Sequence, residues 1–123
     1  MGYHVVDPDD LEPVPDRPSD MRYISEAIGM ENMGLRLYRV QPGEEIPLSG
    51  LHYHDTQEEA FYVVEGTLSI ETPDDTLTIE AGQFFVAEPG SAHRAYVDAE
   101  DSRTVVVGMG APPVEGDAHH YDE

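Results

Sequence analysis

The sequence predicts an all-β fold, a sandwich or a barrel built from roughly nine or ten short strands. Two observations carry this prediction. Apolar and β-branched residues alternate with polar ones over short runs, and Gly, Pro or Asp clusters separate these runs roughly every six to twelve residues. Convincing helical periodicity is missing throughout, which argues against a helical bundle.

Each expected strand is bounded by such a turn signal. The strands are expected at 21–25, 35–41, 52–54, 61–64, 67–71, 76–80, 84–87, 93–97 and 104–109. Within 35–41, Leu35 and Leu37 alternate with Arg36 and Tyr38, the period of a half-buried strand. The connection 26–34 contains two glycines and has room for one short helical turn.

One domain is expected, since 123 residues suffice for a single core but not for two ordinary ones. We divide the chain into an extended Pro/Asp-rich N-terminal arm at 1–20, a barrel at 21–110 and a C-terminal tail at 111–123. Closely spaced prolines keep the arm from forming a helix. The tail is too polar and too often interrupted by Pro and Gly to belong to the core.

Three histidines and one glutamate are expected to converge in this β-structure. His52 and His54 are two residues apart, so a strand points both imidazoles to one face. Glu59 begins the following strand, and His93 follows a Pro-Gly turn. Nitrogen and oxygen ligands of this kind describe a site for one divalent transition metal.

Blander interpretations exist for each of these residues. His52 and His54 can be two exposed imidazoles. Glu58 competes with Glu59 as the carboxylate, but strand parity with Phe61 favours Glu59. The adjacent His119 and His120 point to opposite faces of a strand, so we expect surface residues there.

Two spaced motifs resemble those of the cupin superfamily. The first is His52-x-His54-x4-Glu59-x6-Gly66, and the second is Gly82 followed by Pro89-Gly90-x-x-His93. This resemblance to a small single-domain cupin implies a double-stranded β-helix, or jelly-roll barrel. It also implies one metal ion per chain, chosen from Fe, Mn, Ni, Cu and Zn, held by His52, His54, Glu59 and His93, and a homodimer.

The function that this resemblance implies is a small-molecule metalloenzyme with dioxygenase, isomerase, decarboxylase or lyase chemistry. The alternatives are a non-catalytic module that binds a metal or a small molecule, and a structural dimer stabilised by its metal. No catalytic acid or base is marked. We expect Phe61, Phe84 and Val86 to ring the site. Arg36 and Arg39 either line its mouth or pair with carboxylates, and we favour the second.

The net charge of the chain limits the classes of partner that it can bind. The chain has 26 acidic residues, six arginines and no lysine, for a formal charge of −20, which excludes binding to nucleic acid or to an anionic membrane. Such self-repulsion is relieved by salt, so we expect a halophilic protein. Thermal unfolding in low and in molar KCl tests this expectation, because equal stability in both would contradict it.

Other absences limit the chemistry and the compartment. Without cysteine there is no thiolate ligand, thiol catalysis or disulfide. The sequence contains neither an apolar run of transmembrane length nor a signal-peptide pattern, so we expect a cytoplasmic protein with a small-molecule ligand.

Overall fold

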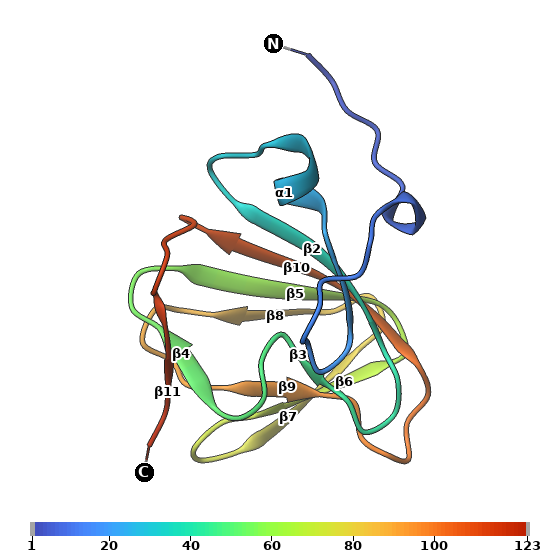
Figure 1. Cartoon of the computed structure of the whole chain (residues 1–123). Coiled ribbons are helices and arrows are strands. Elements are labelled where there is room, and N and C mark those ends of the chain that lie inside the picture. The colour runs from blue at the N-terminus through green and yellow to red at the C-terminus, as the bar shows by residue number, and fades with distance from the viewer. Residues whose placement is uncertain (1, 123) are drawn as a thin grey trace.

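The computed structural model describes residues 2–122, which fold into two facing antiparallel sheets and a third short ladder at one end (Figure 1). The strands are β1 Asp20–Tyr23, β2 Gly34–Val40, β3 Glu45–Ile46, β4 His52–His54, β5 Glu58–Glu65, β6 Thr67–Glu71, β7 Thr76–Glu80, β8 Phe84–Ala87, β9 Arg94–Tyr96, β10 Thr104–Ala111 and β11 Ala118–His120. The helix α1 covers Ile24–Ile28, close to the single helical turn that the sequence allowed.

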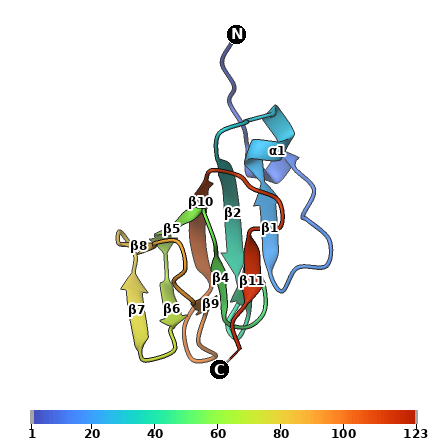
Figure 2. The same ribbon diagram turned by 90° about the vertical axis from the view of Figure 1, so that its left-hand side faces the viewer.

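The two main sheets form a jelly roll. One sheet has the order β1-β2-β10-β5-β8 and the other the order β3-β9-β6-β7, and Figure 2 shows the strands from a second side. The third ladder pairs β11 with β4, so the C-terminal segment closes one end of the barrel. This architecture confirms the predicted all-β, double-stranded β-helix class.

The leucines of β2, which predicted the strand, do not face the barrel interior. The residues that alternate with them do. Tyr38 and Val40 are completely buried, and Arg36 has the same parity. Leu35 and Leu37, whose alternation predicted the strand, are only partly buried on the other face. An arginine therefore points into the barrel along the same line as two core residues.

A glycine lets two aromatic rings fill the middle of the barrel. A Cβ on Gly108 would lie 2.7 Å from Tyr38 Cε2 and 3.5 Å from the Phe61 ring. These two rings pack edge to face with centroids 6.2 Å apart. The glycine is thus required by the close approach of side chains from β2 and β5.

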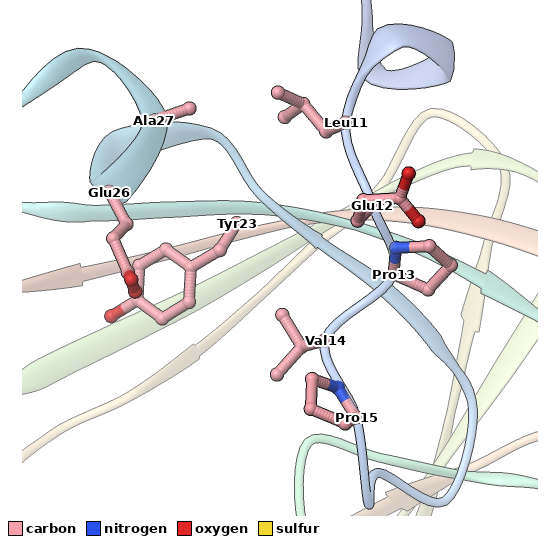
Figure 3. Close-up of a pocket in the computed structure, with 8 residues that line it drawn as sticks. All are labelled: Leu11, Glu12, Pro13, Val14, Pro15, Tyr23, Glu26 and Ala27. Carbon is pink, nitrogen blue, oxygen red and sulfur yellow. The ribbon is translucent and has the colours of Figure 1, made fainter.

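The N-terminal segment lies along the barrel. It contains a 3-10 helix at Pro8–Asp10, and the Val14 amide donates to the Met21 carbonyl at 2.9 Å. Figure 3 shows residues that line a cavity of about 390 Å³ between this segment and α1, where Glu26 lies beside Tyr23. The division of the chain at residues 20 and 110 stays a prediction.

Among the described residues, no helix combines the length and the apolar character needed to span a membrane.

Candidate metal centre

Strand β4 presents two of the predicted histidines to the interior. His52 is 1% exposed, and its ring centroid lies 5.5 Å from that of His54, as expected for residues two apart in a strand. His93 is held opposite His52 by two backbone hydrogen bonds, of 3.0 and 2.9 Å, between these two residues. Main-chain pairing therefore fixes the spacing of the first and third histidines, which lie 41 positions apart in the sequence.

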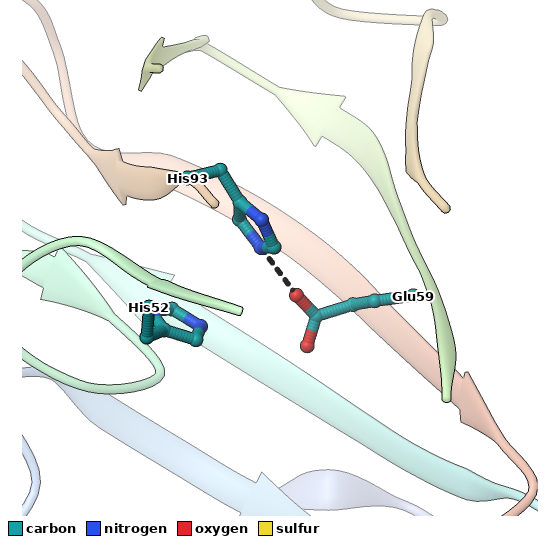
Figure 4. A group of neighbouring side chains, drawn as sticks. All are labelled: His52, Glu59 and His93. Atoms are coloured by element: carbon teal, nitrogen blue, oxygen red, sulfur yellow. Dashed lines mark hydrogen bonds and ion pairs between the residues drawn. The ribbon is translucent and has the colours of Figure 1, made fainter. Parts of the chain in front are cut away.

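The carboxylate of the site comes from the N-terminal end of β5, next to the loop that follows β4. Glu59 is 1% exposed, and its Oε1 lies 2.7 Å from His93 Nε2, the contact drawn in Figure 4. The competing Glu58 is exposed, because neighbouring residues of a strand face opposite ways. The structure thus brings Glu59, and not Glu58, to the histidines.

The histidine tautomers are set by backbone carbonyls. His52 Nδ1 lies 3.2 Å from the Gly50 carbonyl oxygen, and His93 Nδ1 lies 2.9 Å from that of Ser91. Each Nδ1 therefore carries a proton and donates it. The Nε2 atoms of both rings are left facing Glu59, where they are available as ligands.

Three buried polar atoms around this point lack a hydrogen-bond partner within the described part of the chain. They are His52 Nε2, His54 Nε2 and Glu59 Oε2. Each such atom costs about 1–3 kcal/mol if it stays unsatisfied. A cation bound among them would satisfy all three, so these residues fit a metal ion.

The donor atoms of His52, Glu59 and His93 lie within 4.8 Å of one another. His54 stands beside this group of three, with its Nε2 3.5 Å from Glu59 Oε2. All four predicted ligands therefore meet in the lumen, three of them in a tight group and the fourth at its edge.

Burial and pairing set the protonation of the site. Burial raises the pKa of Glu59, but the nearby His54 ring, the hydrogen bond from His93 and the charges of His93 and Arg36 outweigh burial and hold that pKa well below its usual range. Burial lowers the pKa of His93, but its bond to Glu59 outweighs burial and raises that pKa. For His52, burial prevails and the pKa is lowered. Without a metal, these shifts favour a protonated His93 ring beside an ionised Glu59 carboxylate.

Asp117 is a site residue that the sequence analysis missed. Its buried carboxylate accepts hydrogen bonds from the amides of Thr56 and Gln57, and its Oδ2 lies 3.9 Å from His54 Nδ1. Burial raises its pKa, but these backbone hydrogen bonds outweigh burial and lower it. Asp117 thus fixes the loop that joins His54 to Glu59. It lies in the tail, where no local pattern marks it.

On β8, the wrong residues were predicted from sequence to surround the site with apolar side chains. Phe84 and Val86 are both 61% exposed, whereas Phe85 stacks on Phe61 and its ring centroid lies 5.5 Å from that of His93. The cause is the strand register, which pairs Phe61 with Phe85 and so places these two rings on one face.

The two arginines of β2 divide between the two roles considered for them. Arg39 pairs with Asp9 at 2.7 Å, as favoured. Arg36 instead lies at the site, with its Nη2 3.8 Å from Glu59 Oε2. His119 is at the surface, as expected, where its Nε2 lies 2.6 Å from Asp55 Oδ2.

A cavity of about 310 Å³ adjoins the centre and shares Arg36 and His54 with it. Its lining residues are Arg17, Met21, Tyr23, Arg36, Pro47, Leu48, His54, Gln57, Val114, Gly116, Asp117 and Ala118.

Comparison with known proteins agrees with this fold. A family model described as "Cupin domain" matches residues 36–108. The polyketide synthase CurC of Streptomyces cyaneus is 33% identical over 108 residues, which cover 85% of this chain and 68% of CurC.

Two solved structures share the fold at low identity. A sugar phosphate isomerase of the cupin superfamily from Silicibacter pomeroyi superposes with a TM-score of 0.77 at 20% identity, covering 98% of this chain and 83% of the isomerase. The polyketide cyclase RemF from Streptomyces resistomycificus superposes with a TM-score of 0.71 at 21% identity, covering 94% of this chain and 89% of RemF.

Proposed function

Because the chain belongs to the cupin family, we propose that it binds one divalent transition metal ion in the barrel and acts as a small-molecule metalloenzyme of the isomerase or cyclase kind. His52, His54 and His93 would hold the ion through Nε2, and Glu59 through its carboxylate. The observation that carries this proposal is the grouping of buried donor atoms of His52, Glu59 and His93 within 4.8 Å of one another, with the unsatisfied His54 Nε2 beside Glu59. Fe, Mn, Ni, Cu and Zn all suit such a donor set.

The reaction class rests on what the relatives are named for. CurC is a polyketide synthase, RemF a polyketide cyclase and the S. pomeroyi protein a sugar phosphate isomerase. Isomerisation and ring closure both need a proton to be moved and a developing oxyanion to be stabilised. When bound, the metal would supply Lewis-acid polarisation of a substrate oxygen. We therefore favour a carbonyl compound as substrate.

The adjoining cavity favours an enzyme over a purely binding module. A sealed, wholly apolar lumen would suit storage of a ligand. Here the cavity beside the ligands also presents Arg36, Tyr23 and Gln57. A substrate in it would therefore lie beside both the proposed ligands and polar groups able to orient it.

Metal content tests the ligand assignment. We expect about one metal equivalent per chain in wild-type protein loaded in high salt, a loss of binding in His52→Ala and Glu59→Gln, and full binding in His119→Ala. His119 is the matched control because it is a histidine of the same end of the barrel that lies at the surface. Elemental analysis and circular dichroism on the same samples separate lost metal from lost fold.

Two results would contradict the proposal at different levels. Full stoichiometry in both folded ligand variants would overturn the ligand set. If the metal is bound as expected, a screen of 1,3-diketones and other carbonyl substrates, with dioxygen consumption followed in parallel, tests turnover. Activity should disappear with a chelator and return with metal. Stoichiometric metal without any turnover would favour the non-catalytic binding module.

A further inference from the structure

Three of the six arginines form close ion pairs with carboxylates, as expected in a chain of formal charge −20, and Arg103 lies farther from its carboxylate. The closest N–O distances are 2.7 Å for Arg22–Asp20, 2.7 Å for Arg39–Asp9, 2.7 Å for Arg94–Glu45 and 3.7 Å for Arg103–Glu65. Arg17 has no such pair within the described residues, and Arg36 has only the 3.8 Å contact with Glu59. Both line the cavity of about 310 Å³ beside the metal centre.

Arg36 has hydrogen-bonding capacity to spare. Its side chain is 11% exposed, and within residues 2–122 its buried Nε has no partner. The nearest carboxylate, Glu59, is already bonded to His93 and lies beyond hydrogen-bond distance of the guanidinium. A largely buried guanidinium with an unsatisfied donor is costly, and an anion in the cavity would remove that cost.

We propose that this cavity is an anion subsite, in which Arg36 and Arg17 bind a carboxylate or enolate oxygen of an organic substrate. The proposal rests on the proposed function, because it names the substrate class of the same site. A planar guanidinium suits such groups since it can donate two parallel hydrogen bonds. The protein otherwise repels anions, so this local pair also selects where an anion can bind.

The other residues that line the cavity indicate the chemical character of the rest of the ligand. Met21, Tyr23, Leu48 and Val114 supply apolar surface, which suits a carbon skeleton rather than a small inorganic ion. His54 lines both the cavity and the metal centre, so a ligand held by Arg36 lies next to the proposed metal ligands.

A carboxylate of the protein, Asp117, also lies in the wall of the cavity. Its oxygens accept hydrogen bonds from the backbone amides of Thr56 and Gln57 at 2.9–3.2 Å. Those bonds engage its charge and leave the two guanidinium groups as the recognition elements for an incoming anion.

Benzoate and benzamide test the subsite because they have nearly the same shape and differ in charge. Their dissociation constants are measured by calorimetry at one fixed KCl concentration, with metal-loaded and with chelator-treated protein. The variants are Arg36→Gln and Arg17→Gln, and Arg39→Gln is the matched control on the same strand as Arg36. Metal content is measured on every sample.

We expect wild type and Arg39→Gln to prefer benzoate by about tenfold to a hundredfold, the effect of one charge-assisted hydrogen bond. Both cavity variants should lose most of this preference, with and without metal. Arg17 is exposed, so its variant keeps the test valid if Arg36→Gln fails to fold.

Equal binding of the two probes by wild type would overturn the subsite, as would a preference that survives both substitutions. A preference seen only with metal and insensitive to the arginines means that the carboxylate binds the metal, which overturns the subsite and leaves the proposed function intact. An arginine-dependent preference in a protein that takes up no metal supports the anion site and overturns the proposed function.

Discussion

Strand β5 runs from the candidate metal centre into the apolar core, and the two regions are equally buried but chemically opposite. Glu59, Phe61 and Val63 share one face of this strand, and each is 0–1% exposed. Val63 belongs to an apolar core cluster that also contains Leu68 and Ile70. Around Glu59 the neighbours are histidines with unsatisfied nitrogen atoms.

The comparison indicates how the fold supports its site. Burying polar atoms without partners is unfavourable, so the unsatisfied atoms of the metal-free centre lower the stability of the fold. The apolar region contributes favourable free energy of roughly 25 cal/mol per Å² of buried apolar surface. We therefore expect changes in the core to alter the free energy of unfolding, and changes around the centre to alter ligand binding first.

The largest expected effect is on the apolar side. Leu68→Ala should lower the free energy of unfolding by about 2–5 kcal/mol, since Leu68 is completely buried and its removal leaves a cavity. Leu77→Ala, on the neighbouring strand at 40% exposure, should change it by less than about 0.5 kcal/mol. Urea unfolding in molar KCl measures both.

Measuring the metal stoichiometry of the same two variants tests whether the core and the candidate metal centre can be altered independently. Folded Leu68→Ala should still bind its full metal equivalent, because none of the proposed ligands has changed. A folded variant that has lost its metal would show that the two regions are not separable.

The next effect is on the side of the site. Asp117→Asn should weaken metal binding by about tenfold to a hundredfold, the range for groups that orient ligands. An amide cannot accept all the hydrogen bonds that Asp117 takes from Thr56 and Gln57, so the loop between His54 and Glu59 loses its anchor. Competition against a chelator of known affinity measures the change.

Asp55→Asn is the matched control. Asp55 belongs to the same loop, but its side chain pairs with the exposed His119 at the surface. Its substitution should leave metal affinity nearly unchanged. Equal weakening in both variants would mean that loss of an acidic charge, rather than loss of the anchor, decides the affinity.

The strands and the histidine cluster were predictable from sequence because each depends on local information. Alternation marks a strand, and residues two apart in it must share a face, which brings His52 and His54 together. A recognisable motif spacing then adds Glu59 and His93. The structure places all four in the lumen.

What the sequence could not give depends on register or on distant contacts. Phe84, Phe85 and Val86 are all apolar, so period two says nothing about which one faces inward, and only pairing with β5 decides. The alternation of Leu35 and Leu37 similarly suggests that their own face of β2 is the inner one, whereas Arg36 lies on the inner face. Asp117 meets its loop partners 60 and 61 positions away, beyond the reach of any local pattern.

The smallest expected effect is the pH dependence of metal binding and of metal-free stability. It amounts to about 1.4 kcal/mol per pH unit for each proton displaced. The raised pKa of His93 means that this ring is protonated in the metal-free protein below that pKa, and a bound metal must displace the proton. Metal affinity should therefore fall about tenfold per pH unit below the His93 pKa and be level above it. His52 has a lowered pKa and takes up a proton only at lower pH.

The stability of the metal-free protein should change in the opposite direction. A raised pKa in the folded state contributes stability that is complete below the ordinary histidine value of 6.5 and is lost as pH rises through the folded pKa. The lowered pKa of Glu59 contributes stability above its ordinary value of 4.5, and this is lost only as pH falls through the folded pKa, well below that window. Between pH 6.5 and the folded pKa of His93, rising pH thus weakens the metal-free fold while it strengthens metal binding. Calorimetry in two buffers of different ionisation enthalpy counts the protons released, and urea unfolding after chelation follows stability. Affinity and metal-free stability that rise together with pH would show that His93 is not protonated against Glu59, and the pairing at the centre of the site would have to be redrawn.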